Sequence, residues 1–227
     1  MLHQISVDQI TRQFKAAFFD LDGTLFDSEP LHAQALVKAC EQLGINLEGI
    51  DPLHDFLGKP DPAVYRFFHA TKMVPQGVSQ DNFINAKNSH YLANCKDIPS
   101  SKWDDFINPG TRELLKILKD KGILVAIVSA SEEAIVKSMI SNSGIELFFD
   151  HVIARGQCFR SKPSPGPYLS ALRHWGLKGH EAIVFEDSPT GQKAAVLAGC
   201  ELIRVKTFTP QANDNLEAID NFFRLIS

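Results

Sequence analysis

The sequence lacks the features that mark several large classes of protein. No apolar run approaches the ~20 residues that a membrane-spanning helix needs, and residues 1–8 lack the basic-then-apolar build of a signal peptide. The net charge of −4 shows no basic excess for binding nucleic acid. The four cysteines form no CxxC pair, which argues against a zinc site or a disulfide framework. We therefore expect a soluble cytoplasmic protein, a monomer, with neither nucleic acid nor a membrane as a partner.

Short apolar runs that end in polar residues are present instead. They cover 16–19, 123–128 and 182–185, with a fourth candidate at 202–205. Such runs are typical of strands buried on both faces of a parallel sheet. Helical patterns lie between them, over 111–121, 131–144, 165–175 and 189–198. Strands that alternate with helices predict a doubly wound α/β fold with right-handed crossovers.

One long segment breaks this alternation straight after the first strand. Residues 28–106 contain helical patterns and no convincing strand. The helical patterns cover 30–43, 62–70 and 80–94. So long an insert indicates a separate helical domain rather than a loop. We predict an α/β core formed by 1–27 and 108–227, and a helical cap domain at 28–107.

The three clearest strands all end in reactive polar side chains. They are Asp20 and Asp22, Ser129 and Ser131, and Glu186 and Asp187. Lys162 opens a helix between the second and third sets. Because ligands of open α/β sheets bind beyond the carboxyl ends of the strands, we expect these groups to share one crevice.

Several carboxylates in one crevice repel one another unless a cation is present. Oxygen ligands without a Cys/His cluster favour Mg²⁺. The metal ion and Lys162 would together favour a phosphate ligand, whose oxygens Ser129 and backbone N–H groups at a helix start would bind. Asp20 is then a candidate nucleophile, and a nearby carboxyl group away from the metal could act as acid and base.

The segment Asp20-Leu-Asp-Gly-Thr-Leu-Phe-Asp-Ser-Glu-Pro30 resembles the first motif of the haloacid dehalogenase superfamily. Its phosphatase and phosphomutase branch, which has a helical cap of the C1 type and a Rossmann-like core, fits best. Later motifs follow in order at Ser129, at Lys162-Pro163 and at Glu186-Asp187-Ser188. The resemblance spans about 18–200.

The resemblance implies a role for each matched residue. Asp20 would be the nucleophile and a Mg²⁺ ligand, and Asp22 the general acid/base, with its backbone carbonyl on the metal. Asp187 would bind Mg²⁺ directly, and Glu186 directly or through water. The residues implied to hold the phosphoryl group are Ser129, Ala130 and Lys162.

Three further residues are candidates for substrate contacts: His32, Lys59 and Ser131. An exposed hinge histidine and a plain surface lysine are the alternative interpretations of the first two. The chain also departs from the family pattern at two positions. Gly166 stands where relatives often have Asp, and Glu132 stands where relatives acting on sugar phosphates can have a basic or polar residue.

The function that follows is a Mg²⁺-dependent phosphatase acting on a small phosphorylated metabolite, such as a sugar phosphate or phosphoglycolate, through an aspartyl-phosphate. The alternative is a sugar-phosphate isomerase of the β-phosphoglucomutase type, which shares the core residues and differs in whether the cap excludes water. A receiver domain of a signalling protein also phosphorylates an aspartate, but it is a single domain of roughly half this length.

Overall fold

The computed structural model describes residues 6–208 together with Phe222 and Leu225. The chain divides into two compact units, one of Met1–Asp27 with Ser100–Ser227 and one of Ser28–Pro99. We call them the α/β unit and the helical unit. Within the described residues, no helix has both the length and the apolar character to cross a membrane. Residues 1–5, which contributed to the expectation of no signal peptide, lie outside the described part.

Among the described residues, the α/β unit forms a five-stranded sheet with the strand order β3-β2-β1-β4-β5, in which every pairing is parallel. The strands are β1 (Ala16–Phe19), β2 (Leu124–Val128), β3 (His151–Ile153), β4 (Ala182–Glu186) and β5 (Glu201–Arg204). The predicted parallel α/β sheet is confirmed.

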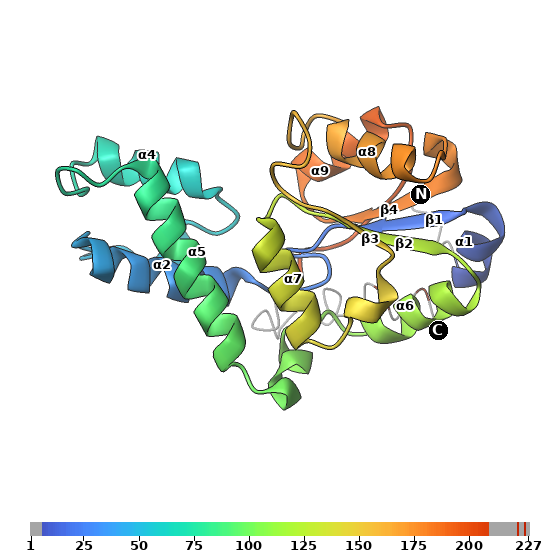
Figure 1. Ribbon diagram of the computed structural model, residues 1–227, viewed down its shortest axis with the longest axis horizontal. Helices are drawn as coiled ribbons and strands as arrows, with labels where there is room; N and C mark the ends of the chain where they lie inside the picture. The colour runs from blue at the N-terminus through green and yellow to red at the C-terminus, as the bar shows by residue number, and fades with distance from the viewer. Residues whose placement is uncertain (1–5, 209–221, 223–224, 226–227) are drawn as a thin grey trace. The chain divides into compact units, whose positions relative to one another are not determined.

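Helices cover both faces of this sheet. Figure 1 shows α8 and α9 on one face and α6 and α7 on the other. The helices that the structure describes in this unit are α1 (Val7–Gln13), α6 (Thr111–Asp120), α7 (Glu133–Asn142), α8 (Gly166–His174) and α9 (Pro189–Leu197), with short 3₁₀ segments at Ser100–Asp105, Glu146–Phe148 and Gly179–Glu181. Cover on both faces explains why all four residues of β1 are buried and apolar.

Side chains of β1 alternate between the two layers. Phe18 belongs to the cluster with Tyr168 of α8, while Phe19 stacks on Phe185 with ring centroids 4.5 Å apart and contacts Phe222 edge to face. The strand that leads into Asp20 is therefore fixed from both sides of the sheet.

The helical unit is fully described, and none of its residues forms a strand. It contains α2 (Glu29–Leu43), α3 (Pro52–Asp55), α4 (Asp61–Ala70) and α5 (Gln80–Asp97). The helices α2, α4 and α5 bury a shared apolar core whose largest members are Phe56, Phe68 and Phe83. The unit has its own core, as a separate domain requires.

The structure differs from the sequence-based expectations at a few places. The structure contains β3, α1 and α3, which were not predicted from the sequence. The helical pattern predicted over 131–144 includes Ser131, but α7 begins at Glu133, and its N-cap residue Glu132 makes no side-chain capping bond. Residues 100–107, which the sequence analysis placed with the insert, belong to the α/β unit, where Trp103 packs edge to face on Phe26.

Candidate active site

A tight turn follows β1 and presents two acids beyond the end of the strand. Gly23 adopts φ +80°, a region that favours glycine. A Cβ atom at this position would lie 2.4 Å from Oδ2 of Asp187 and 3.1 Å from Thr207. Glycine is thus required both by the backbone conformation and by the close approach of Asp187.

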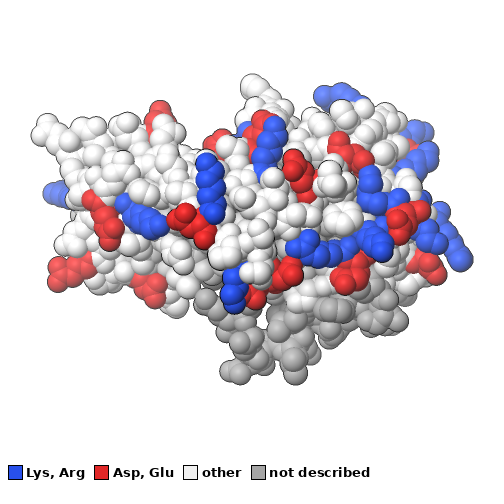
Figure 2. Space-filling view, turned by 60° about the horizontal axis from the view of Figure 1, so that its bottom comes forward, with Lys and Arg blue, Asp and Glu red and all other residues white. Residues whose placement is uncertain are grey.

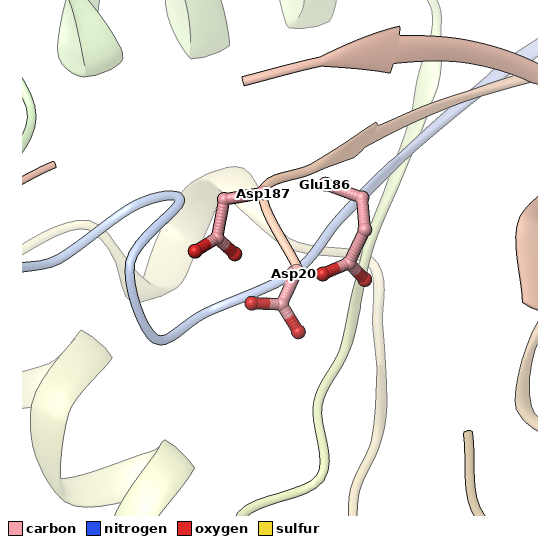
Figure 3. Close-up of side chains that lie close together, drawn as sticks. All are labelled: Asp20, Glu186 and Asp187. Atoms are coloured by element: carbon pink, nitrogen blue, oxygen red, sulfur yellow. The ribbon is translucent and has the colours of Figure 1, made fainter. Parts of the chain in front are cut away.

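Asp20, Glu186 and Asp187 form a cluster of carboxylates at the ends of β1 and β4. One oxygen from each lies within 4.8 Å of the others, and Figure 3 shows the three side chains converging from neighbouring strands. Pairing of the strands brings them together, because the backbone N–H of Asp20 donates to the carbonyl of Phe185 at 3.0 Å. The donors are all oxygens, so their chemistry fits a hard cation such as Mg²⁺.

Lys162 lies buried among these acids. Its Nζ donates to Oδ1 of Asp20 at 2.6 Å, to Oε2 of Glu186 at 2.7 Å and to the backbone carbonyl of Val128 at 2.7 Å. An ammonium group has three N–H donors, so all three are used. Burial opposes the charge, but attraction to Asp20, Tyr168 and Glu186 holds the pKa of Lys162 well above its ordinary value.

The three clustered carboxyl groups outnumber the single ammonium group of Lys162. Burial, followed by repulsion from Glu186, raises the pKa of Asp20 well above its ordinary value although Lys162 lowers it. Burial likewise raises the pKa of Asp187, against hydrogen bonds that its two oxygens accept from Thr207 at 2.9 Å and Thr24 at 3.1 Å. A bound cation would relieve both penalties by favouring the ionised forms.

Asp22 points to a different partner. Its Oδ2 accepts a hydrogen bond from the hydroxyl of Ser131 at 2.6 Å, and its carboxylate is outside the three-residue cluster. The backbone N–H of Ser131 in turn donates to Oγ of Ser129 at 2.9 Å. Ser131 therefore links the second aspartate of the first motif to the end of β2.

The predicted phosphate-binding residues follow β2 in the same unit. Ser129 is buried, and its backbone N–H donates to Ile153 of β3. Ala130 is exposed, and its carbonyl accepts from Nε of Arg155 at 2.7 Å. With Lys162, these residues lie beyond the carboxyl ends of adjacent parallel strands, where the sequence analysis expected them.

His32 and Lys59, the other two candidates for substrate contacts, belong to the helical unit. Nδ1 of His32 lies 3.1 Å from Nζ of Lys87, and the His32 ring packs on Tyr91 at 4.4 Å. Lys59 donates to the backbone carbonyl of Asp55 at 2.8 Å. His32 is thus part of an internal polar cluster of that unit, and Lys59 closes a local turn.

Several residues of the site escaped the sequence analysis. Thr24 falls inside the first motif and could have been found from it. Tyr168, whose hydroxyl donates to Glu186, has the pattern of an ordinary core residue of a helix. Thr207 carries no signal, because it reaches Asp187 from the segment after β5.

Comparison with known proteins agrees with this architecture. Residues 17–205 match the family model of haloacid dehalogenase-like hydrolases, and the chain belongs to that family. It is 30% identical to a phosphorylated carbohydrates phosphatase of Thermotoga maritima over 83% of each chain. It is 27% identical to hexitol phosphatase B of Escherichia coli over 90% of this chain and 88% of that protein.

Among solved structures, CbbY from Rhodobacter sphaeroides in complex with phosphate superposes with a TM-score of 0.74 and 26% identity, covering 86% of this chain and 87% of that one. The chain also matches Arabidopsis thaliana SUPPRESSOR OF QUENCHING 1 with 28% identity, but it spans only 18% of that protein. The predictions that the chain belongs to the haloacid dehalogenase superfamily and that it is a hydrolase are confirmed.

Proposed function

We propose that this protein is a Mg²⁺-dependent phosphatase that hydrolyses a small phosphorylated metabolite of the sugar phosphate or phosphoglycolate type through an aspartyl-phosphate on Asp20. The observation that carries the proposal is the position of Asp20. One of its oxygens is held by Lys162, and it clusters with Glu186 and Asp187 in a site with an excess of carboxylates. Relatives named as phosphatases of phosphorylated carbohydrates and hexitols support the substrate class.

The proposed metal site uses the carboxylates of Asp20 and Asp187 and the backbone carbonyl of Asp22, with Glu186 binding directly or through water. When bound there, Mg²⁺ would neutralise charge that develops on the phosphoryl oxygens. This arrangement agrees with the oxygen-only donor set.

The first step joins Asp20 to phosphorus. Lys162 holds Oδ1 of Asp20, which leaves the other oxygen to attack the phosphoryl group. The bond from phosphorus to the leaving oxygen breaks, and Asp22 donates a proton to that oxygen. Ser129, the Ala130 backbone and Lys162 bind the phosphoryl oxygens; because its three donors are in use, Lys162 exchanges one of its present acceptors for the phosphate.

The second step returns Asp20 to its free form. Asp22, now ionised, accepts a proton from water, and the water oxygen attacks phosphorus while the bond to Asp20 breaks. The hydroxyl of Ser131, bonded to Asp22, would hold this carboxylate in one orientation through both steps.

The insert after β1 would act as a cap that closes over the bound substrate. Its position in the chain, directly after the strand that carries Asp20, supports this role. His32 and Lys59 remain our candidates for substrate contacts from the cap. Closure would exclude bulk water and complete the site around the leaving group.

A screen of phosphorylated metabolites tests the proposal, measuring both released phosphate and isomerised sugar phosphate, with Mg²⁺ and with a chelator. We expect phosphate release that the chelator abolishes. Isomerised product without phosphate release would replace the phosphatase with a mutase, and activity that persists in chelator would refute the metal requirement.

A further inference from the structure

The carboxylate of Glu186 is wholly enclosed and accepts four hydrogen bonds. Its Oε1 accepts from the backbone N–H of Ser188 at 3.1 Å and from the Ser188 hydroxyl at 2.8 Å. Its Oε2 accepts from Lys162 at 2.7 Å and from the hydroxyl of Tyr168 at 2.7 Å. A carboxylate offers about four lone-pair sites, so hydrogen bonds from the protein use all of them, and a metal ion bound directly by Glu186 would replace one of these donors.

Packing fixes this carboxylate as well. Gly191, in the first turn of α9, lies so close that a Cβ atom there would be 1.9 Å from Oε2 of Glu186. No side chain other than hydrogen fits against the carboxylate at that point. Glu186 is therefore held by bonds on both oxygens and by contact with the helix.

Tyr168 reaches the site from α8 as part of the apolar core. It is fully buried, and its ring stacks on Phe18 with centroids 6.5 Å apart. Nζ of Lys162 lies 5.2 Å from the centre of the same ring. A side chain fixed in this way directs its one O–H donor at Glu186 without freedom to turn elsewhere.

We infer that Tyr168 is a positioning residue for the phosphatase site: its hydroxyl and ring hold Glu186 and Lys162 together, and so set where the ammonium group meets Asp20. The inference rests on the proposed function for the identity of the reaction. It extends that function to Tyr168, a residue of the apolar core that lies outside the sequence motifs.

The test is Tyr168→Phe, which removes one oxygen and keeps the ring. Changes in residues that orient metal ligands typically cost about 10–100-fold in metal affinity or activity. We expect kcat/KM on the best substrate to fall by about 10-fold or more and the Kd for Mg²⁺, measured by calorimetry without substrate, to rise. A hydroxyl that only completes the core would lower Tm and leave both values unchanged.

Tyr65→Phe is the matched control, because its hydroxyl also makes one hydrogen bond, to the carbonyl of Val78 at 2.8 Å within the helical unit. It should leave Mg²⁺ affinity unchanged. In a Glu186→Gln background, Tyr168→Phe should cost little more, since the tyrosine acts through Glu186. Fully additive losses would overturn the inference.

Ser188→Ala provides a second route if Tyr168→Phe does not fold, since it removes one of the two hydrogen bonds to the other oxygen of Glu186 and should also weaken Mg²⁺ binding. The two proposals fail differently. A wild-type protein that hydrolyses no phosphate ester would refute the proposed function, whereas wild-type Mg²⁺ affinity and rate in the tyrosine variant would refute the inference.

Discussion

Each unit of the molecule contains a cluster in which a buried lysine side chain pairs with carboxylate groups. The two clusters differ in their balance of charge. In the helical unit, Lys87 pairs with Asp61 beside the ring of His32, so one ammonium meets one carboxylate. In the α/β unit, Lys162 contacts Asp20 and Glu186, and Asp187 belongs to the same acidic cluster.

This difference separates a structural cluster from a binding site. A balanced buried pair satisfies its own charges. An excess of carboxylates does not: burial first, and then repulsion from Glu186, raise the pKa values of Asp20 and Asp187. A bound cation would relieve this burial of uncompensated charge at the ends of the strands. By contrast, Figure 2 shows basic and acidic side chains interspersed over the surface of the face in view. The described residues visible on that face form no broad patch of one charge.

The largest effect should come from Asp20→Asn. An amide cannot form the acyl-phosphate, so turnover should fall to background, as measured by phosphate release at saturating Mg²⁺. Circular dichroism and Tm would verify that the variant is folded. Retention of even a tenth of the wild-type rate would exclude Asp20 as the nucleophile.

The two lysines provide a direct test of the comparison. Lys162→Met removes the cation that pairs with two buried carboxylates, and Lys87→Met the cation that pairs with one. Breaking a buried pair in this way typically costs about 3–5 kcal/mol. In denaturant titrations, Mg²⁺ should recover part of the loss in Lys162→Met, because it replaces the missing positive charge among the acids. It should not help Lys87→Met. If Mg²⁺ restored the stability of both variants equally, or of neither, the distinction between a structural cluster and a metal-binding site would be wrong.

The smallest expected effect is on the stability of the metal-free protein as a function of pH. Because the pKa values of Asp20 and Asp187 are raised in the folded state, first by burial, the folded protein binds more protons than the unfolded chain. Their contribution to stability is complete below the unfolded pKa and declines as pH rises through the folded values.

In chelator, Tm should therefore increase as pH falls from about 7 towards about 5. Saturating Mg²⁺ should weaken this trend, because the ion keeps the carboxylates ionised. Differential scanning calorimetry at several pH values measures it. A Tm in chelator that falls steadily over the same range would show that other groups dominate.

The sequence was sufficient to predict that the acidic residues and the lysine of the site lie close together, because parallel strands present their carboxyl ends at one edge of the sheet. These residues are Asp20, Lys162, Glu186 and Asp187. The short apolar runs at β1, β2 and β4 were sufficient to place that edge. The strand β3 was not found, since it has only three residues and begins with the polar His151.

Contacts between distant segments were beyond the reach of sequence patterns. Ser131 has the local pattern of a helix cap, yet its hydroxyl bonds to Asp22, 109 residues away. Tyr168 has the spacing of a core residue, and only the packing of α8 against the sheet directs its hydroxyl at Glu186. At Gly166, where the sequence departs from the expected motif, a Cβ atom would lie 3.1 Å from the carbonyl of Arg160.

The most direct test of the central claim is to find the phosphoryl group on the protein during turnover. Acid-quenched enzyme, mixed with a substrate from the screen, would be digested and analysed by mass spectrometry. We predict one phosphoryl group on the peptide that contains Asp20, labile to hydroxylamine and absent from Asp20→Asn. A phosphoryl group on another residue, or turnover without any phosphorylated protein under rapid quenching, would contradict the account.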